Sequence, residues 1–350
     1  MRLSICVIRR LKIGLLTQNC NTYITIANHQ VGIEINFMNS VAIIIPALNE
    51  AQNIVSSLAE ILRHTEKITD IEFVLIVVDD GSSDETAELV RERGQSSDDN
   101  IRLLCLNRHF GKEAAIYAGI VNAVRFDAAI VMDSDLQHPP QLIGEMISNW
   151  QQGYQVVEGV KDSRGGESRS KSLLVRMYYR LFSFFTKLSI NGDTDFKLLD
   201  KAVIQAYNDL PEHGRFFRGL VKWMNFPTKQ ISFDAPASVR SSSSWESGSL
   251  FRYAISSIAS FTAFPLQIVT FLGGVTFLIS IVLGGIALFD KLSGEAVTGF
   301  TTVILLILLI GSILMTSVGL IGIYVGKIYD EVKRRPNYLV NRAKSNLDGL

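Results

Sequence analysis

Residues 128–140 read AAIVMDSDLQHPP, an apolar run that gives way at once to charged and polar residues. Ala128–Met132 has the length and composition of a buried strand, and the two closing prolines suit the first turn of a helix. Asp133 and Asp135 leave this strand two positions apart, where they repel each other without a cation. Carboxylate oxygens suit Mg²⁺ or Mn²⁺, which also take phosphate oxygens. The stretch predicts a strand-end metal site, with a solvated turn as the alternative.

Short apolar runs and helical patterns alternate on both sides of this strand. The pattern predicts further strands at 41–46, 73–78, 101–106 and 156–160, and helices at 53–62, 84–93, 112–124 and 140–150. Such alternation implies an α/β domain with a mostly parallel, Rossmann-like sheet and helices on both faces. Ligands of these sheets bind at the carboxyl ends of the strands, where the polar clusters of this chain lie. The sequence contains neither GxGxxG after the first strand nor a GxxxxGK[ST] loop, which disfavours dinucleotide oxidoreductases and P-loop NTPases.

Two more polar clusters follow predicted strands. Asp79 and Asp80 precede Gly81, where a carboxylate can accept hydrogen bonds from a ribose or a base; turn formation or helix capping is the alternative. Arg108 and Lys112 lie at the start of a predicted helix, a position that suits an anionic ligand. Ordinary surface charge is the alternative for these two cations.

The composition limits the classes of protein that fit. The 350 residues contain 34 basic and 34 acidic side chains, and this zero net charge argues against a nucleic-acid partner. Charged residues make up 19% and hydrophobic residues 47%, with a mean hydropathy of +0.23, so part of the chain is expected to lie in lipid. Three cysteines exclude a disulfide-built scaffold, and no CxxC pair offers a zinc site.

The apolar excess lies near the C-terminus. Residues 265–289 and 300–326 are both free of charged side chains, and each exceeds the roughly 20 residues that cross a bilayer as a helix. A short link makes them a hairpin, and the basic residues of 327–350 place the C-terminus in the cytoplasm. The domain before the hairpin then lies on the same side. Glycines in both spans permit close helix contact, which is compatible with a homo-oligomer.

The expected division of the chain follows from these features. A signal peptide before residue 40 is disfavoured, because its apolar run is short and no cleavage site follows. We hypothesise that Met38 is a natural start and that the preceding residues lie outside the fold. The expected parts are an extension (1–37), a catalytic domain (38–240), a juxtamembrane segment (241–264), two transmembrane helices (265–326) and a basic cytoplasmic tail (327–350).

Four motifs together resemble those of family 2 inverting glycosyltransferases, which have the GT-A fold. They are IPALNE (45–50), VDDGS (78–82), NRHFGKE (107–113) and MDSDLQHPP (132–140). The resemblance is strongest to the polyprenyl-phosphate glycosyltransferases, similar to dolichol-phosphate mannose synthase. The two C-terminal spans make the chain most similar to the bactoprenol glucosyltransferases, over roughly residues 40–340.

The resemblance implies roles for the residues at the strand ends. Substrate contacts fall on Pro46, Asn49, Glu50, Asp79, Asp80, Lys112 and Asp133. Of these, Asp79 and Asp80 would hold the nucleoside. Asp133 and Asp135 match the DxD motif that binds metal and diphosphate, with Gln137 close to the metal.

The resemblance also points to a catalytic carboxylate in GDTDFKL (192–198), matched by Asp195. A threonine precedes this aspartate where glycine is usual, and Lys197 stands in place of arginine. Asp193 is therefore a second candidate. A lipid phosphate is mostly dianionic at neutral pH, since its second pKa lies near 6. We therefore expect the carboxylate to orient the acceptor or the sugar more than to remove a proton.

Several arginines are candidates for holding phosphate groups. Arg215 and Arg218 are predicted partners of the diphosphate or the lipid phosphate, with structural pairing on a helix as the alternative. Arg164 and Arg169 are predicted to hold the lipid phosphate. Residues 173–188 are rich in aromatic and basic side chains, which favours an amphipathic helix at the bilayer surface over a core helix.

The two spans predict a protein of the cytoplasmic (inner) membrane, and the resemblance implies an enzyme that moves a hexose, with glucose favoured, to undecaprenyl phosphate. The resemblance implies a nucleotide sugar as donor, with UDP-glucose favoured and GDP-mannose or a UDP-N-acetyl sugar as alternatives. The expected cofactor is Mg²⁺ or Mn²⁺. One alternative is a processive polysaccharide synthase, although the chain has neither the QxxRW motif nor the additional spans of those enzymes. Another is a non-catalytic membrane scaffold. A flippase or a downstream glycosyltransferase is a compatible protein partner.

Overall fold

The computed structural model describes residues 15–18, 21–26, 29–32, 39–96, 100–161, 192–233, 264–293 and 299–346. The strands are β1 (Leu15–Gln18), β2 (Asn21–Ile26), β3 (His29–Gly32), β4 (Asn39–Ala47), β5 (Ile71–Asp79), β6 (Ile101–Cys105), β7 (Ala128–Val131), β8 (Val156–Lys161), β9 (Asp193–Asp200) and β10 (Thr228–Phe233). The helices are α1 (Ile54–Thr65), α2 (Thr86–Ser96), α3 (Lys112–Asn122), the 3₁₀ helix η2 (Pro140–Leu142), α4 (Ile143–Gln151), α6 (Lys201–Asp209), α7 (Phe217–Trp223), α9 (Phe264–Leu292) and α10 (Phe300–Lys333). The predictions for Arg164, Arg169 and residues 173–188 lie outside the described residues.

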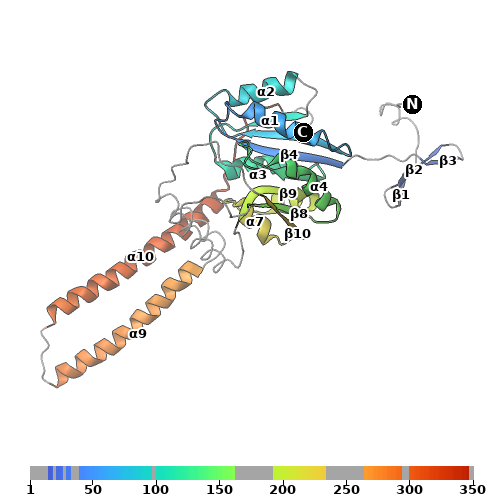
Figure 1. Ribbon diagram of the computed structural model, residues 1–350. Coiled ribbons are helices and arrows are strands. Elements are labelled where there is room, and N and C mark those ends of the chain that lie inside the picture. The colour runs from blue at the N-terminus through green and yellow to red at the C-terminus, as the bar shows by residue number, and fades with distance from the viewer. Residues whose placement is uncertain are drawn as a thin grey trace.

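A seven-stranded sheet forms the centre of the molecule, in the order β10-β8-β9-β7-β4-β5-β6 (Figure 1). The pairs β4–β5, β4–β7, β5–β6 and β8–β10 are parallel, whereas β9 is antiparallel to both of its neighbours. The predicted fold class, a GT-A-like α/β domain with a mostly parallel sheet followed by two long apolar helices, is confirmed. All five predicted strands are present.

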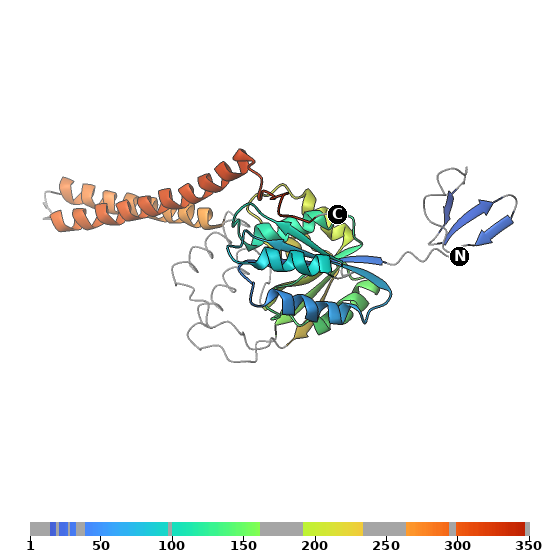
Figure 2. The ribbon, with the colours of Figure 1, turned by 90° about the horizontal axis from the view of Figure 1, so that it is seen from above.

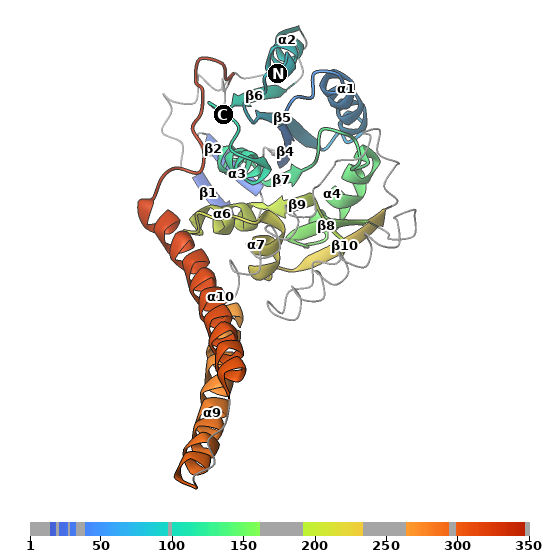
Figure 3. The ribbon, with the colours of Figure 1, turned by 90° about the vertical axis from the view of Figure 1, so that its left-hand side faces the viewer.

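Helices cover both faces of this sheet, and β4 shows why. Val41, Ile43 and Ile45 pack on one face with α1, α2 and α4, whereas Ala42 and Ile44 pack on the other face with α3, α6 and α7. Figure 3 shows this arrangement nearly along the strands. Because both faces are buried, the strand is a continuous apolar run instead of an alternating one. This is the pattern from which the sequence predicted it.

Two strands of the sheet were not predicted. β9 reads DTDFKLLD, in which four charged residues interrupt the apolar pattern, although Asp193, Asp195 and Lys197 are all buried. β10 lies at the edge of the sheet, where Ile231 and Phe233 are buried and its other residues are exposed. The charged side chains of β9 can be buried because they pair with each other and with residues of neighbouring elements. A local sequence pattern does not reveal such pairs.

The N-terminal strands form a sheet of their own. β1 pairs with β2 and β2 with β3, all antiparallel, and none of them pairs with the seven-stranded sheet within the described residues. Figures 1 and 2 show this small sheet apart from the main domain. None of these three strands was predicted from the sequence. The alternating pattern of NTYITI (21–26) was the available signal for β2.

Helices α9 and α10 extend side by side away from the domain (Figures 1 and 2). They contain 29 and 34 residues, or roughly 44 and 51 Å of helix at 1.5 Å per residue. Their windows Val269–Ile286 and Leu309–Lys333 are apolar and long enough to cross a membrane, and nothing within the described part of the chain buries them. The two helices therefore have the length and exposure expected for membrane association.

The segment after α10 returns to the domain. Arg334 ends the helix in a left-handed conformation, with φ of 48°. Val340 then forms a bridge with Leu106, and Asn346 forms one with Leu103, so the chain extends along the edge at β6. Tyr338 packs against Tyr117 of α3, with 5.8 Å between the ring centroids. At least part of the predicted cytoplasmic tail is thus bound to the domain formed by the seven-stranded sheet.

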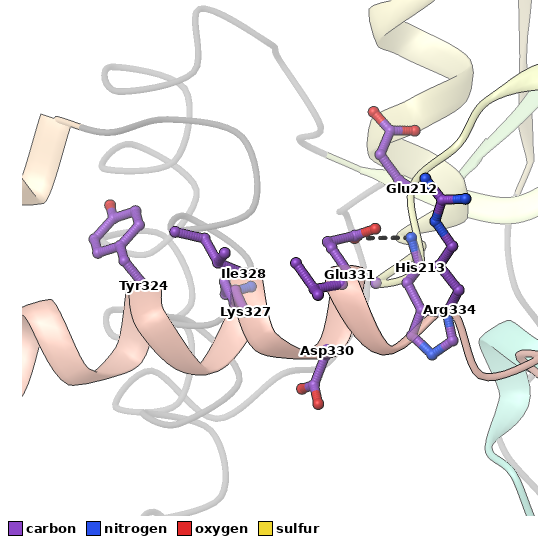
Figure 4. A pocket seen from close by; sticks show the side chains of 10 residues that line it. Glu212, His213, Tyr324, Lys327, Ile328, Asp330, Glu331 and Arg334 are labelled. Atoms are coloured by element: carbon purple, nitrogen blue, oxygen red, sulfur yellow. Dashed lines mark hydrogen bonds between the residues drawn. The ribbon is translucent and has the colours of Figure 1, made fainter.

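A second contact joins α10 to the domain close to this turn. Glu331 accepts a hydrogen bond of 2.8 Å from the backbone nitrogen of His213, which lies between α6 and α7 (Figure 4). A pocket of about 600 Å³ lies at this joint and is lined by residues 212–214 and by the last turns of α10. The end of α10 and the segment after it are therefore fixed at two places, the loop between α6 and α7 and the surface formed by α3 and β6.

Candidate active site

A pocket of about 340 Å³ lies at the carboxyl ends of β4, β5 and β7. This is the edge at which parallel α/β sheets bind ligands. It is lined by Pro46, Ala47, Leu48, Glu50, Asp80, His109, Lys112, Ala115, Asp133, Ser134 and Asp135. The structure thus brings together six of the predicted site residues: Pro46, Glu50, Asp80, Lys112, Asp133 and Asp135.

Lys112, the first residue of α3, joins two of the candidate acids. Its Nζ lies 2.6 Å from Asp133 Oδ1 and 2.7 Å from Asp195 Oδ2. Burial by itself lowers the pKa of Lys112, but the two carboxylates outweigh it and hold the pKa above its ordinary value. Lys112 is therefore a permanent cation at the centre of the site.

Asp195 of β9 has a second cationic partner. Arg218 of α7 donates from Nε to Oδ1 at 2.6 Å and from a terminal nitrogen to Oδ2 at 2.9 Å, which is a bidentate pair. Asp195 is only 4% exposed, and burial alone would raise its pKa. The bonds from Arg218 and the charge of Lys112 reverse this effect and hold the pKa well below its usual range. Asp195 therefore stays ionised between two cations.

Asp193 lies in a different environment. Its carboxylate pairs with Lys197, whose Nζ also lies 2.8 Å from Glu158 Oε1. Lys222 Nζ lies 3.1 Å from Glu158 Oε2. Burial raises the pKa of Asp193 despite the attraction of Lys197. Asp193 thus belongs to a buried charge cluster, whereas Asp195 joins Lys112 and, through it, the pocket.

Hydrogen bonds between backbone nitrogens and nearby side chains hold the DxD segment after β7 in place. The backbone nitrogen of Asp133 donates to His138 Nδ1 at 3.0 Å, and that of Gln137 donates to Asp135 Oδ1 at 3.1 Å. Leu136 has φ of 57°, a strained conformation of the kind that persists where surrounding structure enforces it. Burial lowers the pKa of His138, which stacks on Phe196 at 5.1 Å, so this histidine is a neutral support.

The donor set of this segment is compatible with a divalent ion. Within the described ranges, no group of three or more acidic, histidine or cysteine side chains forms a complete metal site. Asp133 and Asp135 nevertheless line the same pocket. Mg²⁺ usually binds through one or two carboxylates, with substrate phosphates and water as the other ligands. The residues therefore fit an ion whose coordination a diphosphate completes.

Asp80 organises the loop that leads to α3. Its Oδ1 accepts from the backbone nitrogen of Phe110 at 2.8 Å, and its Oδ2 accepts from that of Gly111 at 2.9 Å. His109 Nδ1 lies 2.7 Å from the same Oδ2. Gly81 permits this packing: it has φ of 74°, and a Cβ there would lie 2.4 Å from a backbone carbon of Arg108. Asp80 thus positions the loop that presents Lys112.

The loop after β4 is bonded to the loop after β5. Asn49 accepts from the backbone nitrogen of Ser83 at 2.9 Å, and the backbone nitrogen of Glu50 donates to Thr86 at 2.8 Å. Asp79 is buried and accepts long hydrogen bonds from Ser82; burial raises its pKa. The predicted residues Asn49, Glu50 and Asp79 therefore belong to one hydrogen-bonded region at the ends of β4 and β5.

Arg215 has partners away from the acidic residues. Its terminal nitrogens donate to the carbonyl oxygens of Tyr207 at 2.8 Å and Leu210 at 2.6 Å. Its guanidinium lies 3.7 Å from the ring centroid of Tyr117. These contacts match the structural alternative: Arg215 fastens the segment between α6 and α7, while Arg218 reaches Asp195.

Glu113 lies next to Lys112 on α3 and was not among the site residues predicted from the sequence. It follows Lys112 on α3 and accepts a 2.8 Å hydrogen bond from the backbone nitrogen of Phe217, the first residue of α7. Burial raises the pKa of Glu113 to about 7 despite this bond. Glu113 thus links α3, which carries Lys112, to α7, which carries Arg218. The sequence signal for Glu113 was its position directly after Lys112 in the motif NRHFGKE (107–113).

The shifted pKa of Glu113 predicts that the wild-type protein loses stability as pH rises from about 5 to 8. Above the unfolded-state pKa of 4.5, the unfolded chain releases a proton that the folded chain keeps up to about pH 7. This contribution is complete below the unfolded pKa and disappears as pH rises through the folded one. Melting temperatures at several pH values should therefore fall more steeply for wild type than for Glu113→Gln. Equal slopes would contradict the prediction.

Comparison with known proteins identifies the family. The pattern described as Glycosyl transferase family 2 matches residues 42–206. An uncharacterised glycosyltransferase of Synechocystis is 35% identical over 302 residues, which is 86% of this chain and 94% of that protein. This chain belongs to glycosyltransferase family 2. The prophage bactoprenol glucosyl transferase homolog of Escherichia coli K12 is 29% identical over 306 residues, covering 87% of this chain and 99% of that protein.

One solved structure is also similar to part of this chain. Glucosyl-3-phosphoglycerate synthase from Mycobacterium tuberculosis, in complex with Mn²⁺, UDP-glucose and phosphoglyceric acid, is 20% identical, covers 63% of this chain and 79% of that chain, and has a TM-score of 0.46. The predicted enzyme class, a family 2 glycosyltransferase, is confirmed by the sequence relatives. The chain is related over most of its length to bactoprenol glucosyl transferases.

Proposed function

We propose that this enzyme transfers a hexose, with inversion, from a nucleotide diphosphate sugar to polyprenyl phosphate at the cytoplasmic face of the inner membrane. Glucose is the favoured sugar, because several relatives are named as bactoprenol glucosyl transferases. UDP-glucose is therefore the favoured donor. Residues 38–240 are assigned to the catalytic domain and 265–326 to the membrane hairpin. The two long, exposed apolar helices support delivery of the site to a lipid-borne acceptor.

The observation that carries the proposal is the line of charges from Asp135 through Asp133 and Lys112 to Asp195 and Arg218. Acids that suit a divalent ion lie at one end. Cations that suit phosphate oxygens lie in the middle and at the other end. Such an arrangement fits a reaction in which one phosphate group departs and another attacks.

In the proposed reaction, a phosphate oxygen of the acceptor attacks the anomeric carbon while the bond from that carbon to the diphosphate breaks. A divalent ion bound at Asp133 and Asp135 would neutralise charge on the departing diphosphate. Lys112 lies beside Asp133, where its ammonium can meet the same diphosphate. Asp195, kept ionised by Arg218, orients the sugar or the acceptor, since the dianionic phosphate has little need of a base.

The distribution of basic residues around the hairpin supports a cytoplasmic position for the domain that carries the site. Basic residues after α10 favour the cytoplasmic side, and the hairpin returns the domain to that side. Nucleotide sugars are cytoplasmic, so the donor and the site share one compartment. A processive synthase is disfavoured by the absence from the sequence of a QxxRW motif.

The test is a donor screen with Asp135→Asn as the discriminating variant. Purified protein in detergent is incubated with undecaprenyl phosphate, Mg²⁺ or Mn²⁺ and a panel of nucleotide sugars, and the lipid products are identified by mass. Wild type should form a hexosyl lipid, with UDP-glucose as the best donor. Asp135→Asn should lower the rate about 10²-fold or more, because removing a group that stabilises the leaving charge has this size of effect. Unchanged product formation by the variant would favour a scaffold role or a different site.

A further inference from the structure

Lys112 occupies the space between the acids that the proposed function requires. Its single ammonium lies within 2.7 Å of both Asp133 and Asp195. The acids come from β9 and from the segment just after β7, two strands that pair with each other, and the lysine is the first residue of α3. A lysine ammonium is a compact point charge with three donors, so it can satisfy two carboxylates at once.

This ion pair changes what Asp133 can offer to a metal. Asp133 and Asp195 contact the ammonium of Lys112, and Arg218 also pairs with Asp195. Glu50, Asp80 and Asp135 line the same pocket as Lys112 and Asp133. Asp133 is directly paired with the ammonium, while Asp135 accepts a hydrogen bond from the backbone of Gln137. A divalent ion bound to Asp133 in this state would lie beside a permanent positive charge, and like charges at such distances repel strongly.

We propose that Lys112 keeps the divalent-ion site closed until a diphosphate binds and draws the ammonium away from Asp133. This inference rests on the proposed metal site at Asp133 and Asp135. A diphosphate supplies several negative oxygens next to the pocket, so Lys112 exchanges one anionic partner for another. Asp133 then becomes available, and ion and nucleotide binding are positively coupled. The enzyme would thus take up metal together with nucleotide, not before it.

The decisive measurement is Mn²⁺ binding to the full chain in detergent without nucleotide. Wild type should bind Mn²⁺ weakly, and Lys112→Gln should bind it about tenfold more tightly, which lies within the usual range of coupling between sites. Free Mn²⁺ can be followed by its electron paramagnetic resonance signal. Addition of UDP should tighten binding to wild type much more than binding to the variant.

Two control variants separate the charge of Lys112 from general effects. Lys201→Gln removes a lysine with the same 45% side-chain exposure and an Asp127 partner at 3.7 Å. It should bind Mn²⁺ as wild type does. Lys112→Arg retains the positive charge and should keep the site closed without UDP. If only Lys112→Gln binds Mn²⁺ more tightly than wild type, the closure is due to the positive charge at position 112.

The outcomes distinguish this inference from the function on which it rests. If wild type binds Mn²⁺ with UDP but Lys112→Gln without UDP is no tighter than wild type, the closure is refuted and the metal site stands. If no variant binds Mn²⁺ with or without UDP, the metal site itself is refuted, and the closure falls with it. Tighter Mn²⁺ binding by wild type in the presence of UDP does not by itself support the closure, because diphosphate oxygens also coordinate the ion.

Discussion

Asp195→Asn should lower the rate of sugar transfer about 10³-fold or more while the protein remains folded. Asp195 is the anion that faces both Lys112 and Arg218, with contacts of 2.6 to 2.9 Å. Asparagine has nearly the same shape, so the packing around β9 can persist. Without the negative charge, however, the two cations repel each other and the orientation of the phosphate and the sugar is lost.

The measurement is the initial rate of hexosyl-lipid formation, together with the melting temperature of each variant. Asp193→Asn is the matched control, since it makes the same change two residues away on the same strand. Asp193 contacts Lys197 in the buried cluster, so its variant should lose stability and keep transfer within a few-fold of wild type per folded molecule. Equal losses of transfer in both variants would show that the geometry does not distinguish the two aspartates.

The choice between these aspartates shows what the sequence could and could not predict. The motif GDTDFKL placed a carboxylate near the site but left two candidates. Side chains alternate along a strand, so Asp193 and Asp195 project from the same face of β9. Thr194, between them, donates to the carbonyl oxygen of Gly159 at 2.6 Å. Their environments differ because Arg218 and Lys112 come from α7 and α3, elements remote in sequence.

The edge of the sheet that carries the site was predictable because it depends on local patterns. Short apolar runs such as residues 41–46 predicted parallel strands, and parallel strands present their carboxyl ends together. The same reasoning placed Asp80 and Asp133 at one edge. Partners are harder to predict, because they depend on tertiary contacts. Asp80 bonds to the loop at Phe110 and Gly111, and Arg215 bonds to carbonyl oxygens, roles that the motifs alone did not distinguish from substrate binding.

Lys197→Met should lower the free energy of unfolding by about 3–5 kcal/mol, because it removes one partner from a buried ion pair. Lys197 is completely buried and its ammonium contacts both Glu158 and Asp193. In the variant, Lys222 remains 3.1 Å from Glu158, while Asp193 loses its cation. Domains are commonly stable by only about 5–15 kcal/mol, so this loss should lower the melting temperature markedly.

Lys201→Met is the control for this prediction, because its lysine is 45% exposed and its ion pair with Asp127 is long. Exposed pairs of this kind contribute about 0–1 kcal/mol. Denaturation midpoints in detergent would compare the two variants, and similar midpoints would contradict the expected cost of the unpaired buried acid. Lys197→Arg, which restores the residue usual in the resembling family, tests the role of charge. If positive charge matters, arginine should recover more stability than methionine, because it can still pair with Asp193 and Glu158 despite its larger head group.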